Sequence, residues 1–196
     1  VVLCTATQPQ MDLPRTPREL MPDVSSLYDQ LRRVDYLPQL TPRANRDAAA
    51  DIARMLAQQS VLTIVNTKAA AWEIYSEATQ LLREQGCTPA VIDTTLSDEQ
   101  IRSRAQNGAP DEILCVHMST LLCPAHRQAL IRWIKIWLQM HRRVLCVSTA
   151  LIEAGINVSF PVVVRSLTGL PSIVQAAGRA NRSMEYPQGV VYIWDL

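Results

Sequence analysis

Short runs of apolar, mostly β-branched residues recur along the chain, with amphipathic segments between them. Six such runs follow one another after residue 60 and lie at 61–65, 90–92, 113–116, 144–147, 162–164 and 190–194. They are apolar throughout, whereas a strand with one solvated face would alternate apolar and polar residues. Strands that are buried on both faces and alternate with helices are typical of parallel sheets. The sequence therefore predicts an α/β fold: a three-layer open sheet, mostly parallel, with helices on both faces.

The segments between these runs have a helical period. Besides the helix at 172–182 that is described below, four helices are expected, at 47–58, 67–86, 97–106 and 124–141. In the second helix, the spacing places Trp72 and Tyr75 on the inner face together with smaller apolar residues. The last helix has an unusually wide apolar face that includes Trp133 and Met140. That width indicates either contact with another domain or deep burial.

Residues 9–45 differ from the rest because they hold half of the chain's 12 prolines. Proline at this density is incompatible with a continuous helix or a central strand, although 24–33 has room for a short element. We therefore expect an arm that connects two bodies, with regular structure beginning after it. The predicted division is 1–8 as the end of a preceding lobe, 9–45 as the arm and 46–196 as the α/β lobe.

The stretch 172–182 concentrates polar groups on one face of an expected helix. Gln175, Arg179 and Arg182 are spaced four and three residues apart, so they share a face in a helix of 3.6 residues per turn. Gly178 lies beside this stripe, where the missing side chain leaves room for another group. Two guanidiniums and an amide suit a phosphate group. Taken alone, two arginines on a solvated helix face are the simpler explanation.

Small hydroxyl residues follow several of the expected strands. Thr67 comes after the first strand, Ser119 and Thr120 after the third, and Ser148 and Thr149 after the fourth. Ligands of parallel sheets gather at the carboxyl ends of the strands, and hydroxyl groups at helix starts suit the phosphates of a nucleic acid. Helix capping explains any one of these loops more simply. Several loops of this kind at one edge favour a binding site.

Charge and motif content limit the function classes. Nineteen basic residues nearly balance 18 acidic ones, so any binding to nucleic acid depends on individually placed groups. Neither G-x-x-x-x-G-K-[ST] nor G-x-G-x-x-G occurs in the chain. The chain can thus offer arginines to a triphosphate, but the loop that cradles the phosphates is expected on a second body.

Cysteine, histidine and hydropathy patterns exclude other classes. The five cysteines form no Cys-x-x-Cys pair, which favours reduced, buried thiols. The three histidines are far apart in sequence, so no metal site is expected. No apolar run approaches the roughly 18 residues of a membrane helix, and no signal-peptide pattern is present. These features favour a cytoplasmic protein that does not enter a membrane.

The motifs, taken in order, resemble those of a known family. Thr5-Ala6-Thr7, the proline-rich arm, an α/β lobe and a closing Gln-x-x-Gly-Arg-x-x-Arg resemble a superfamily-two helicase, from motif three of its first RecA-like lobe through its second lobe. Six strings resemble, more narrowly, the CRISPR-associated helicase-nuclease of type I systems. They are Val-Asn-Thr at 65–67, His-Met-Ser-Thr at 117–120, Cys-Pro-Ala-His-Arg at 123–127, Val-Ser-Thr-Ala-Leu-Ile-Glu-Ala-Gly at 147–155, Gly-Leu-Pro-Ser-Ile at 169–173 and Gln-Ala-Ala-Gly-Arg-Ala-Asn-Arg at 175–182.

The resemblance implies the second lobe of an ATP-dependent single-stranded DNA translocase that acts with a nuclease in CRISPR antiviral defence. Arg182 would be the arginine finger and Arg179 its partner on the γ-phosphate of ATP, which the first lobe would hold with magnesium. Gln175 would help to fix this motif near the nucleotide. Gly155 and Asn157 belong to motif five, which would also contact the nucleotide, and Asn157 replaces a commonly acidic residue there. An asparagine can hydrogen-bond a ribose or an arginine, but it cannot neutralise a charge.

Further roles and partners follow from the same resemblance. Thr5 and Thr7 would couple hydrolysis to lobe movement. Five hydroxyl residues would contact the sugar-phosphate backbone of single-stranded DNA without regard to sequence, namely Thr67, Ser119, Thr120, Ser148 and Thr149. The partners would be the first lobe, the nuclease domain and an RNA-guided surveillance complex. The chain lacks a Walker loop and an Asp-Glu-x-His box. By itself it is therefore expected neither to bind nor to hydrolyse ATP.

Two alternatives stay open at this point. The chain could be a lobe of another superfamily-two DNA or RNA helicase, although the strings at 117–120 and 123–127 argue against that by resemblance. It could also be a non-catalytic module that binds a protein partner or a protein inhibitor. The broad apolar helix face with Trp133 and Met140 motivates this second alternative.

Overall fold

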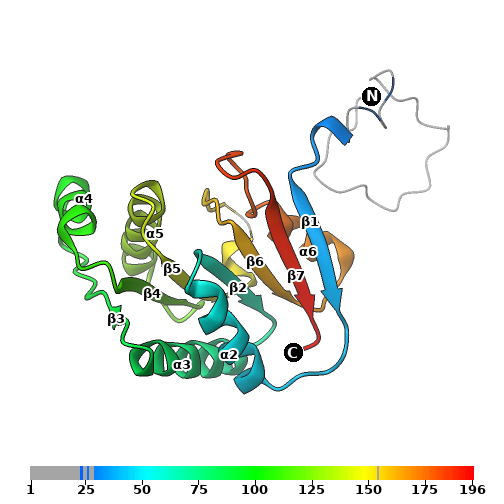
Figure 1. Cartoon of the computed structure of the whole chain (residues 1–196), viewed down its shortest axis with the longest axis horizontal. Helices are drawn as coiled ribbons and strands as arrows, with labels where there is room; N and C mark the ends of the chain where they lie inside the picture. Colours follow the sequence, from blue (N-terminus) through cyan, green and yellow to red (C-terminus); the bar gives the residue numbers. More distant parts are fainter. Residues whose placement is uncertain (1–22, 24–25, 27–28, 154) are drawn as a thin grey trace.

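The computed structural model describes residues 23, 26, 29–153 and 155–196. Seven parallel strands form one sheet in the order β1-β7-β6-β2-β5-β4-β3 (Figure 1). The strands are β1 Val34–Gln39, β2 Val61–Val65, β3 Thr88–Pro89, β4 Glu112–Met118, β5 Val144–Thr149, β6 Val162–Ser166 and β7 Gly189–Trp194. The helices are α2 Asn45–Leu56, α3 Lys68–Glu84, α4 Asp98–Asn107, α5 Pro124–Gln139, the short 3₁₀ helix η1 Ala150–Ile152 and α6 Leu170–Ala177.

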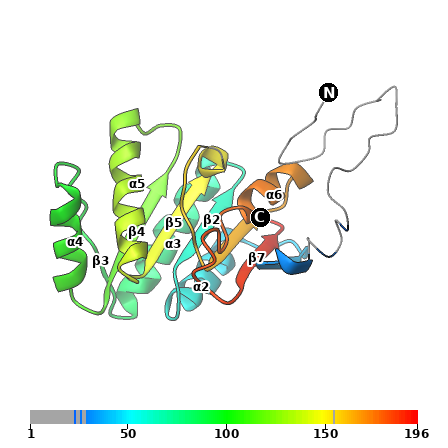
Figure 2. The same ribbon diagram turned by 90° about the horizontal axis from the view of Figure 1, so that it is seen from above.

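Helices cover the sheet on both faces, which confirms the predicted three-layer α/β fold. Helices α2 and α3 pack on one face, and α4, α5, α6 and η1 pack on the other (Figure 2). Side chains of the central strands alternate between the two cores, so that Leu62 and Ile64 meet one layer while Val61 and Val65 meet the other. Because both faces are covered, these strands are apolar at nearly every position. None of the helices in the described part of the chain is long and apolar enough to cross a membrane.

Regular structure begins earlier than expected, and this part of the sequence interpretation was wrong. Strand β1 falls within the proline-rich stretch and pairs with β7, from Val34 beside Gly189 to Gln39 beside Trp194. It tolerates Pro38 because it is an edge strand, where a missing backbone N–H need not break a ladder on both sides. The expected strand at 90–92 is also displaced, since β3 lies at Thr88–Pro89. The predicted Thr5 and Thr7, and the segment 1–8, lie outside the described residues.

The inner face of α3 differs from the expectation. Trp72 is 59% exposed, and the buried stripe consists of Ala71, Ile74, Ala78 and Leu82. The expected stripe with Trp72 and Tyr75 and the observed stripe with Ala71 and Ile74 both have helical spacing. The observed stripe, which begins with smaller side chains, faces the sheet. Trp72 was therefore wrongly placed in the core.

The wide apolar face of α5 is explained by deep burial. Trp133 and Ile136 are buried in the core, and Met140 packs against it. The indole N–H of Trp133 donates to the carbonyl of Asp93 at 3.0 Å, so its polar atom is also satisfied. The hypothesis of a protein-binding module rested on this face and loses that basis.

Candidate functional site

The expected helix at 172–182 ends earlier than its polar spacing suggests. Helix α6 stops at Ala177, with Gly178 as its C-cap. Arg179 and Arg182 therefore lie in the following turn, while Gln175 stays on the helix. Ala180 forms an isolated parallel bridge with Phe160, which holds this turn against the sheet. The three predicted side chains come together through this turn, and not through a shared helix face as expected.

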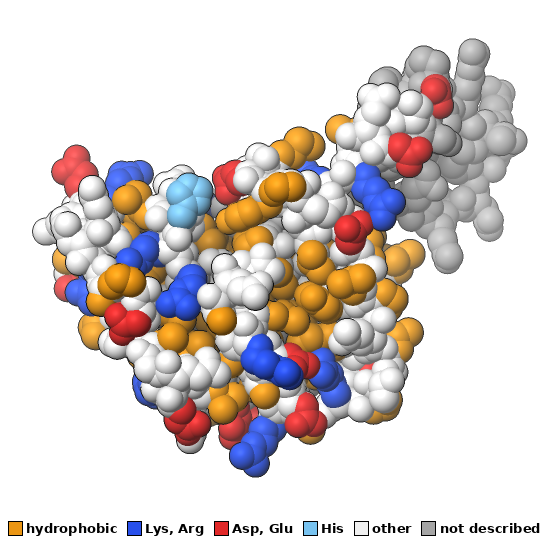
Figure 3. Space-filling model, in the orientation of Figure 1, with side chains coloured by type: hydrophobic (Ala, Val, Ile, Leu, Met, Phe, Trp, Pro, Cys, Tyr) orange, Lys and Arg blue, Asp and Glu red, His pale blue; other side chains and the backbone are white. Residues whose placement is uncertain are grey.

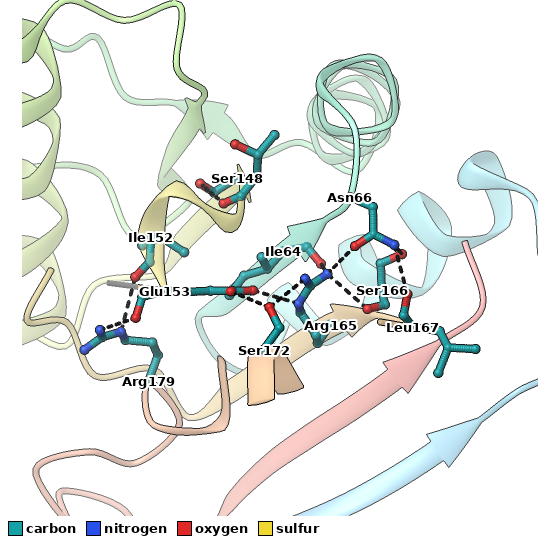
Figure 4. Close-up of polar contacts among 11 residues, drawn as sticks. Ile64, Asn66, Ser148, Ile152, Glu153, Arg165, Ser166, Leu167, Ser172 and Arg179 are labelled. Carbon is teal, nitrogen blue, oxygen red and sulfur yellow. Dashed lines mark hydrogen bonds and ion pairs between the residues drawn. The ribbon is translucent and has the colours of Figure 1, made fainter. Parts of the chain in front are cut away.

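The guanidinium of Arg179 is held inside the domain. Its Nε donates to the carbonyl of Ile152 at 3.2 Å, and its Nη2 donates to the carbonyl of Glu153 at 2.6 Å (Figure 4). The residue is only 7% exposed. Burial lowers the pKa of Arg179, the neighbouring charge of Arg182 lowers it further, and Glu153 opposes both effects. Arg179 thus ties the loop after β5 to the turn after α6.

A hollow of about 490 Å³ opens beside this turn, and we call it the arginine hollow. Its lining comprises Arg33, Val34, Tyr36, Glu153, Val174, Gln175, Ala177, Gly178, Arg179 and Arg182. Arg33 donates from Nη1 to the carbonyl of Arg182 at 3.3 Å and brings a third guanidinium to the site. The side chain of Arg182 is exposed. Three guanidiniums around one hollow suit an anion.

Among the described residues of this lining, only Glu153 carries a carboxylate, and that carboxylate is engaged elsewhere. Its Oε1 lies 2.8 Å from Nε of Arg165, and its Oε2 accepts a hydrogen bond from the hydroxyl of Ser172 at 2.5 Å. Nη2 of Arg165 also donates to the Ser172 hydroxyl at 3.2 Å. Arg165 is 2% exposed, and burial lowers its pKa while Glu153 raises it. Because Arg165 neutralises Glu153, the charge that faces the hollow is positive.

The same contacts continue toward the neighbouring strand end. Nη1 of Arg165 donates to Oδ1 of Asn66 at 2.8 Å, and Nδ2 of Asn66 donates to the carbonyl of Leu167 at 2.9 Å (Figure 4). Asn66 directly precedes Thr67, the first of the predicted hydroxyl residues. The Glu153–Arg165 network, made of Asn66, Glu153, Arg165, Ser172 and Arg179, therefore links the loops after β2, β5 and β6.

The sheet register brings the predicted hydroxyl residues to one edge, which we call the carboxyl edge. Val65, two residues before Thr67, pairs with Thr149, and Met118, just before Ser119, pairs with Ser148. On the face drawn in Figure 3, acidic and basic side chains are interspersed, in keeping with the near-balance of charge. Any hold on a nucleic acid at this edge would therefore come from individual groups.

These hydroxyl residues differ in their burial and in the local hydrogen bonds that they make. Thr67 caps α3, where its Oγ1 accepts from the N–H of Ala70 at 3.1 Å. Ser148 is buried and donates to the carbonyl of Thr149 at 2.8 Å. Ser119 is buried in the turn after β4, with its Oγ 3.4 Å from the N–H of Leu121. Thr67 and Thr120 are exposed and Thr149 is half-buried, so these three residues are more accessible than the two buried serines.

Gly155 and Asn157 are exposed residues in the connection between η1 and β6. Gly155 has a φ of 72°, a left-handed conformation that favours glycine. Neither residue lines the arginine hollow. Their assignment to nucleotide binding stays a prediction.

Comparison with known proteins decides the family. The family model described as "CRISPR-associated nuclease/helicase Cas3, C-terminal" matches residues 57–185. The chain belongs to this family. The match covers β2 through the turn after α6, so it contains the carboxyl edge and all the lining residues of the arginine hollow except Arg33, Val34 and Tyr36.

Individual Cas3 proteins agree with the assignment. A stretch of 52 residues, 26% of this chain, is 50% identical to the CRISPR-associated nuclease/helicase Cas3 of Haloferax volcanii and covers 6% of that protein. The crystal structure of T. fusca Cas3-AMPPNP matches with a TM-score of 0.55 at 15% identity, over 84% of this chain and 18% of that one. That of T. fusca Cas3-ATP matches with a TM-score of 0.53 at 14% identity, over 94% and 19%.

The two solved structures share the fold at low identity, and this chain spans less than a fifth of each. The seven-stranded parallel sheet with helices on both faces is the RecA-like fold of these Cas3 structures. The prediction of a RecA-like α/β lobe is therefore confirmed. The individual residue roles are not tested by this likeness.

Sequence analysis did not identify two charged residues of the site, Arg165 and Arg33. Arg165 stands at the end of an apolar strand, Val-Val-Val-Arg-Ser at 162–166, and arginine is seldom fully buried unless it is paired. That position was a signal for a buried partner. Arg33 offered no such signal, because it lies 149 residues from Arg182 in the sequence and within the proline-rich stretch.

The structure also separates the thiols. Burial raises the pKa of Cys115 to about 11 and that of Cys146 to about 12, so both are protonated at neutral pH. Cys123 is exposed just before α5, which departs from the expected burial of the cysteines. In the part of the chain that is described, no three His, Cys, Asp or Glu side chains are arranged to hold a metal ion.

Proposed function

We propose that this Cas3-family lobe is the second RecA-like half of an ATP-dependent single-stranded DNA translocase that works with a nuclease in the cytoplasm. The arginine hollow carries this proposal. It presents Arg33, Arg179 and Arg182, and the single carboxylate in its lining is neutralised by Arg165. Such a site suits the phosphates of ATP, and the chain has no phosphate-cradling loop of its own. The nucleotide would therefore be shared with a first lobe.

Arg182 is the residue best suited to act as an arginine finger. Its side chain is exposed, whereas Arg179 is fixed to two carbonyls of the loop after β5. A finger must reach across a cleft to the transferred phosphoryl group, where it stabilises developing negative charge. Arg179 would contact the γ-phosphate through the guanidinium N–H groups that do not bind the carbonyls of Ile152 and Glu153. Gln175 would assist from the neighbouring helix α6.

The lining of the hollow is consistent with magnesium being bound by the first lobe and not by this one. Magnesium ions take oxygen ligands, often one or two carboxylates together with phosphate oxygens. The only lining carboxylate, Glu153, is engaged with Arg165 and Ser172. We therefore assign the metal to the first lobe and the arginines to this one. When bound, ATP supplies the phosphoryl group whose transfer drives movement, and this chain's residues bind and neutralise it.

We assign the carboxyl edge to the DNA backbone. Thr67 follows β2, Ser119 and Thr120 follow β4, and Ser148 and Thr149 end β5, which lies between those two strands. Hydroxyl and backbone N–H groups contact phosphates and sugars without reading bases. The proposed partners are single-stranded DNA, the first lobe, the nuclease domain and an RNA-guided surveillance complex.

The ATPase test uses the full-length parent protein with single-stranded DNA present. Arg182→Ala is expected to lower DNA-stimulated turnover on the order of 10³-fold, because the finger stabilises the transition state. Arg102→Ala is the matched control, since Arg102 is exposed on α4 and away from the hollow. Turnover that is equal in the two variants would contradict the finger assignment. The isolated chain is expected to show no ATP hydrolysis.

The DNA test measures affinity for unrelated single-stranded sequences. Thr149→Val keeps the side-chain shape and removes the hydroxyl group, so it should weaken binding by a similar factor for every sequence. Thr88→Val is the control, because Thr88 begins β3 at the opposite edge of the sheet. A loss confined to one sequence would argue against a contact with the DNA backbone.

A further inference from the structure

Trp72 stands apart from the other tryptophans of the chain. Trp133, Trp137 and Trp194 are essentially fully buried, whereas Trp72 is 59% exposed. A single exposed apolar side chain is common at protein surfaces, so the surroundings of Trp72 decide what its ring can do. It lies in the second turn of α3, five residues after Thr67 at the carboxyl edge.

The ring of Trp72 contacts two further rings, those of His117 and Tyr75. The ring of His117 meets it edge-on, with centroids 5.6 Å apart and an interplanar angle of 80°. The ring of Tyr75 lies 5.9 Å from Trp72 and 5.7 Å from His117. These distances are those of favourable aromatic pairs. We call Trp72, Tyr75 and His117 the aromatic cluster, and its mutual contacts hold the exposed ring in one position.

The cluster is electrically neutral near its exposed ring. Burial lowers the pKa of His117, which favours the uncharged imidazole at neutral pH. Burial also raises the pKa of Tyr75, which keeps its phenol protonated. A neutral, braced indole presents a flat π-face, which suits another flat π-system.

The surroundings of the cluster supply the other half of a nucleotide site. His117 is the second-last residue of β4, immediately before Met118 and Ser119. Lys68 is exposed and precedes Trp72 by four residues, so both project from one side of α3. An ammonium group and an exposed ring one helical turn apart match the phosphate and base of one nucleotide. Thr67 adds a hydroxyl group at the same helix start.

We propose that Trp72, braced by Tyr75 and His117, is a stacking platform for an unpaired base of single-stranded DNA. This inference rests on the proposed function, because it requires a DNA strand at the carboxyl edge. Backbone contacts alone would let the strand slide with its bases free. A ring stacked on one base would mark a position along the strand without reading its identity, since every base has a π-face.

The experiment compares two single-stranded oligonucleotides of equal length on the full-length protein, one with bases and one abasic throughout. Trp72→Ala should weaken binding of the base-bearing strand about 5- to 150-fold, the range measured for loss of one base stack. Binding of the abasic strand should not change. Trp72→Phe should keep most of the affinity, whereas Trp72→Leu should lose it, although leucine is also apolar.

Lys68→Ala provides the complementary pattern. It should weaken both strands alike and lower the slope of log affinity against log salt concentration by about 1, because it removes one phosphate contact. Trp72→Ala should leave that slope unchanged. The two variants therefore separate stacking from charge at two positions one turn apart on the same helix.

The outcomes separate failure of this inference from failure of the proposed function. If the unmodified protein fails to bind single-stranded DNA, both are overturned. If it binds but Trp72→Ala weakens both strands equally or neither, only the platform is overturned. If Trp72→Phe loses as much as Trp72→Leu, the ring acts through packing and the platform is again overturned. Loss of association with another protein domain, with DNA binding intact, would make this face a protein interface instead.

Discussion

Breaking the buried ion pair between Glu153 and Arg165 should strongly destabilise the fold, and Glu153→Gln tests this. The substitution keeps the size of the side chain and removes its charge. Arg165 would then carry an uncompensated positive charge at 2% exposure. Removing one partner of a buried pair costs about 3–5 kcal/mol, because the remaining charge has lost the attraction that offset its desolvation.

The structure argues for the lower end of that range. Arg165 keeps hydrogen bonds to Asn66, Ser166 and Ser172, and the glutamine carbonyl can still accept from the arginine. We therefore expect a loss of about 3 kcal/mol. A domain with a total stability of about 5–15 kcal/mol would lose a large share of it.

The assay is urea unfolding of the chain followed by far-UV circular dichroism. With a slope of about 1–3 kcal/mol per M, the midpoint should fall by roughly 1–3 M. Glu84→Gln is the control, because Glu84 is exposed on α3 and should change stability by less than about 0.5 kcal/mol. Replacing both partners, as in Glu153→Leu with Arg165→Met, should recover much of the loss. A Glu153→Gln cost below about 1 kcal/mol would refute the reasoning.

Three further predictions concern capping, thiol reactivity and pH. Ser97→Ala should cost about 1 kcal/mol in urea unfolding, because Ser97 forms a complete capping box at the start of α4. Alkylation at pH 8 followed by mass spectrometry should label the exposed Cys123 quickly, while Cys115 and Cys146 react only after unfolding. Burial places the pKa of His117 below its ordinary 6.5, so the unfolded chain binds this proton first as pH falls. The stability contribution of His117 should be intact above pH 6.5 and decline below it, and His117→Phe should reduce that decline in unfolding measurements.

Local patterns in the sequence determined the architecture of this protein. The continuous β-branched run at 61–65 became β2 with the same boundaries, since such a run is stable only between two apolar layers. Ser97 and Pro124 mark the starts of α4 and α5 because capping and first-turn geometry depend on the nearest residues alone. The fold class followed from this alternation.

Ambiguous local patterns were decided by packing. Two overlapping helical stripes run along α3, and spacing alone could not choose between one with Trp72 and one with Ala71 and Ile74. In the structure, Ala71 and Ile74 pack against the sheet and Trp72 lies at the surface. Likewise, the spacing of Gln175, Arg179 and Arg182 suggested one helix face. In the fold, α6 ends at Ala177, and the turn after it directs Arg179 inward.

The candidate site itself belongs to the tertiary structure. Hydrophobic periodicity encodes which face of an element is buried, but it carries no information about which loops meet. Arg165 contacts Glu153 because β5 and β6 both pair with β2, which brings the loop after β5 close to the end of β6. Arg33 reaches Arg182 only because β1 joins the far edge next to β7. The sequence pattern identified Arg179 and Arg182, whereas the order of strands in the sheet places Arg33 beside them at the same hollow.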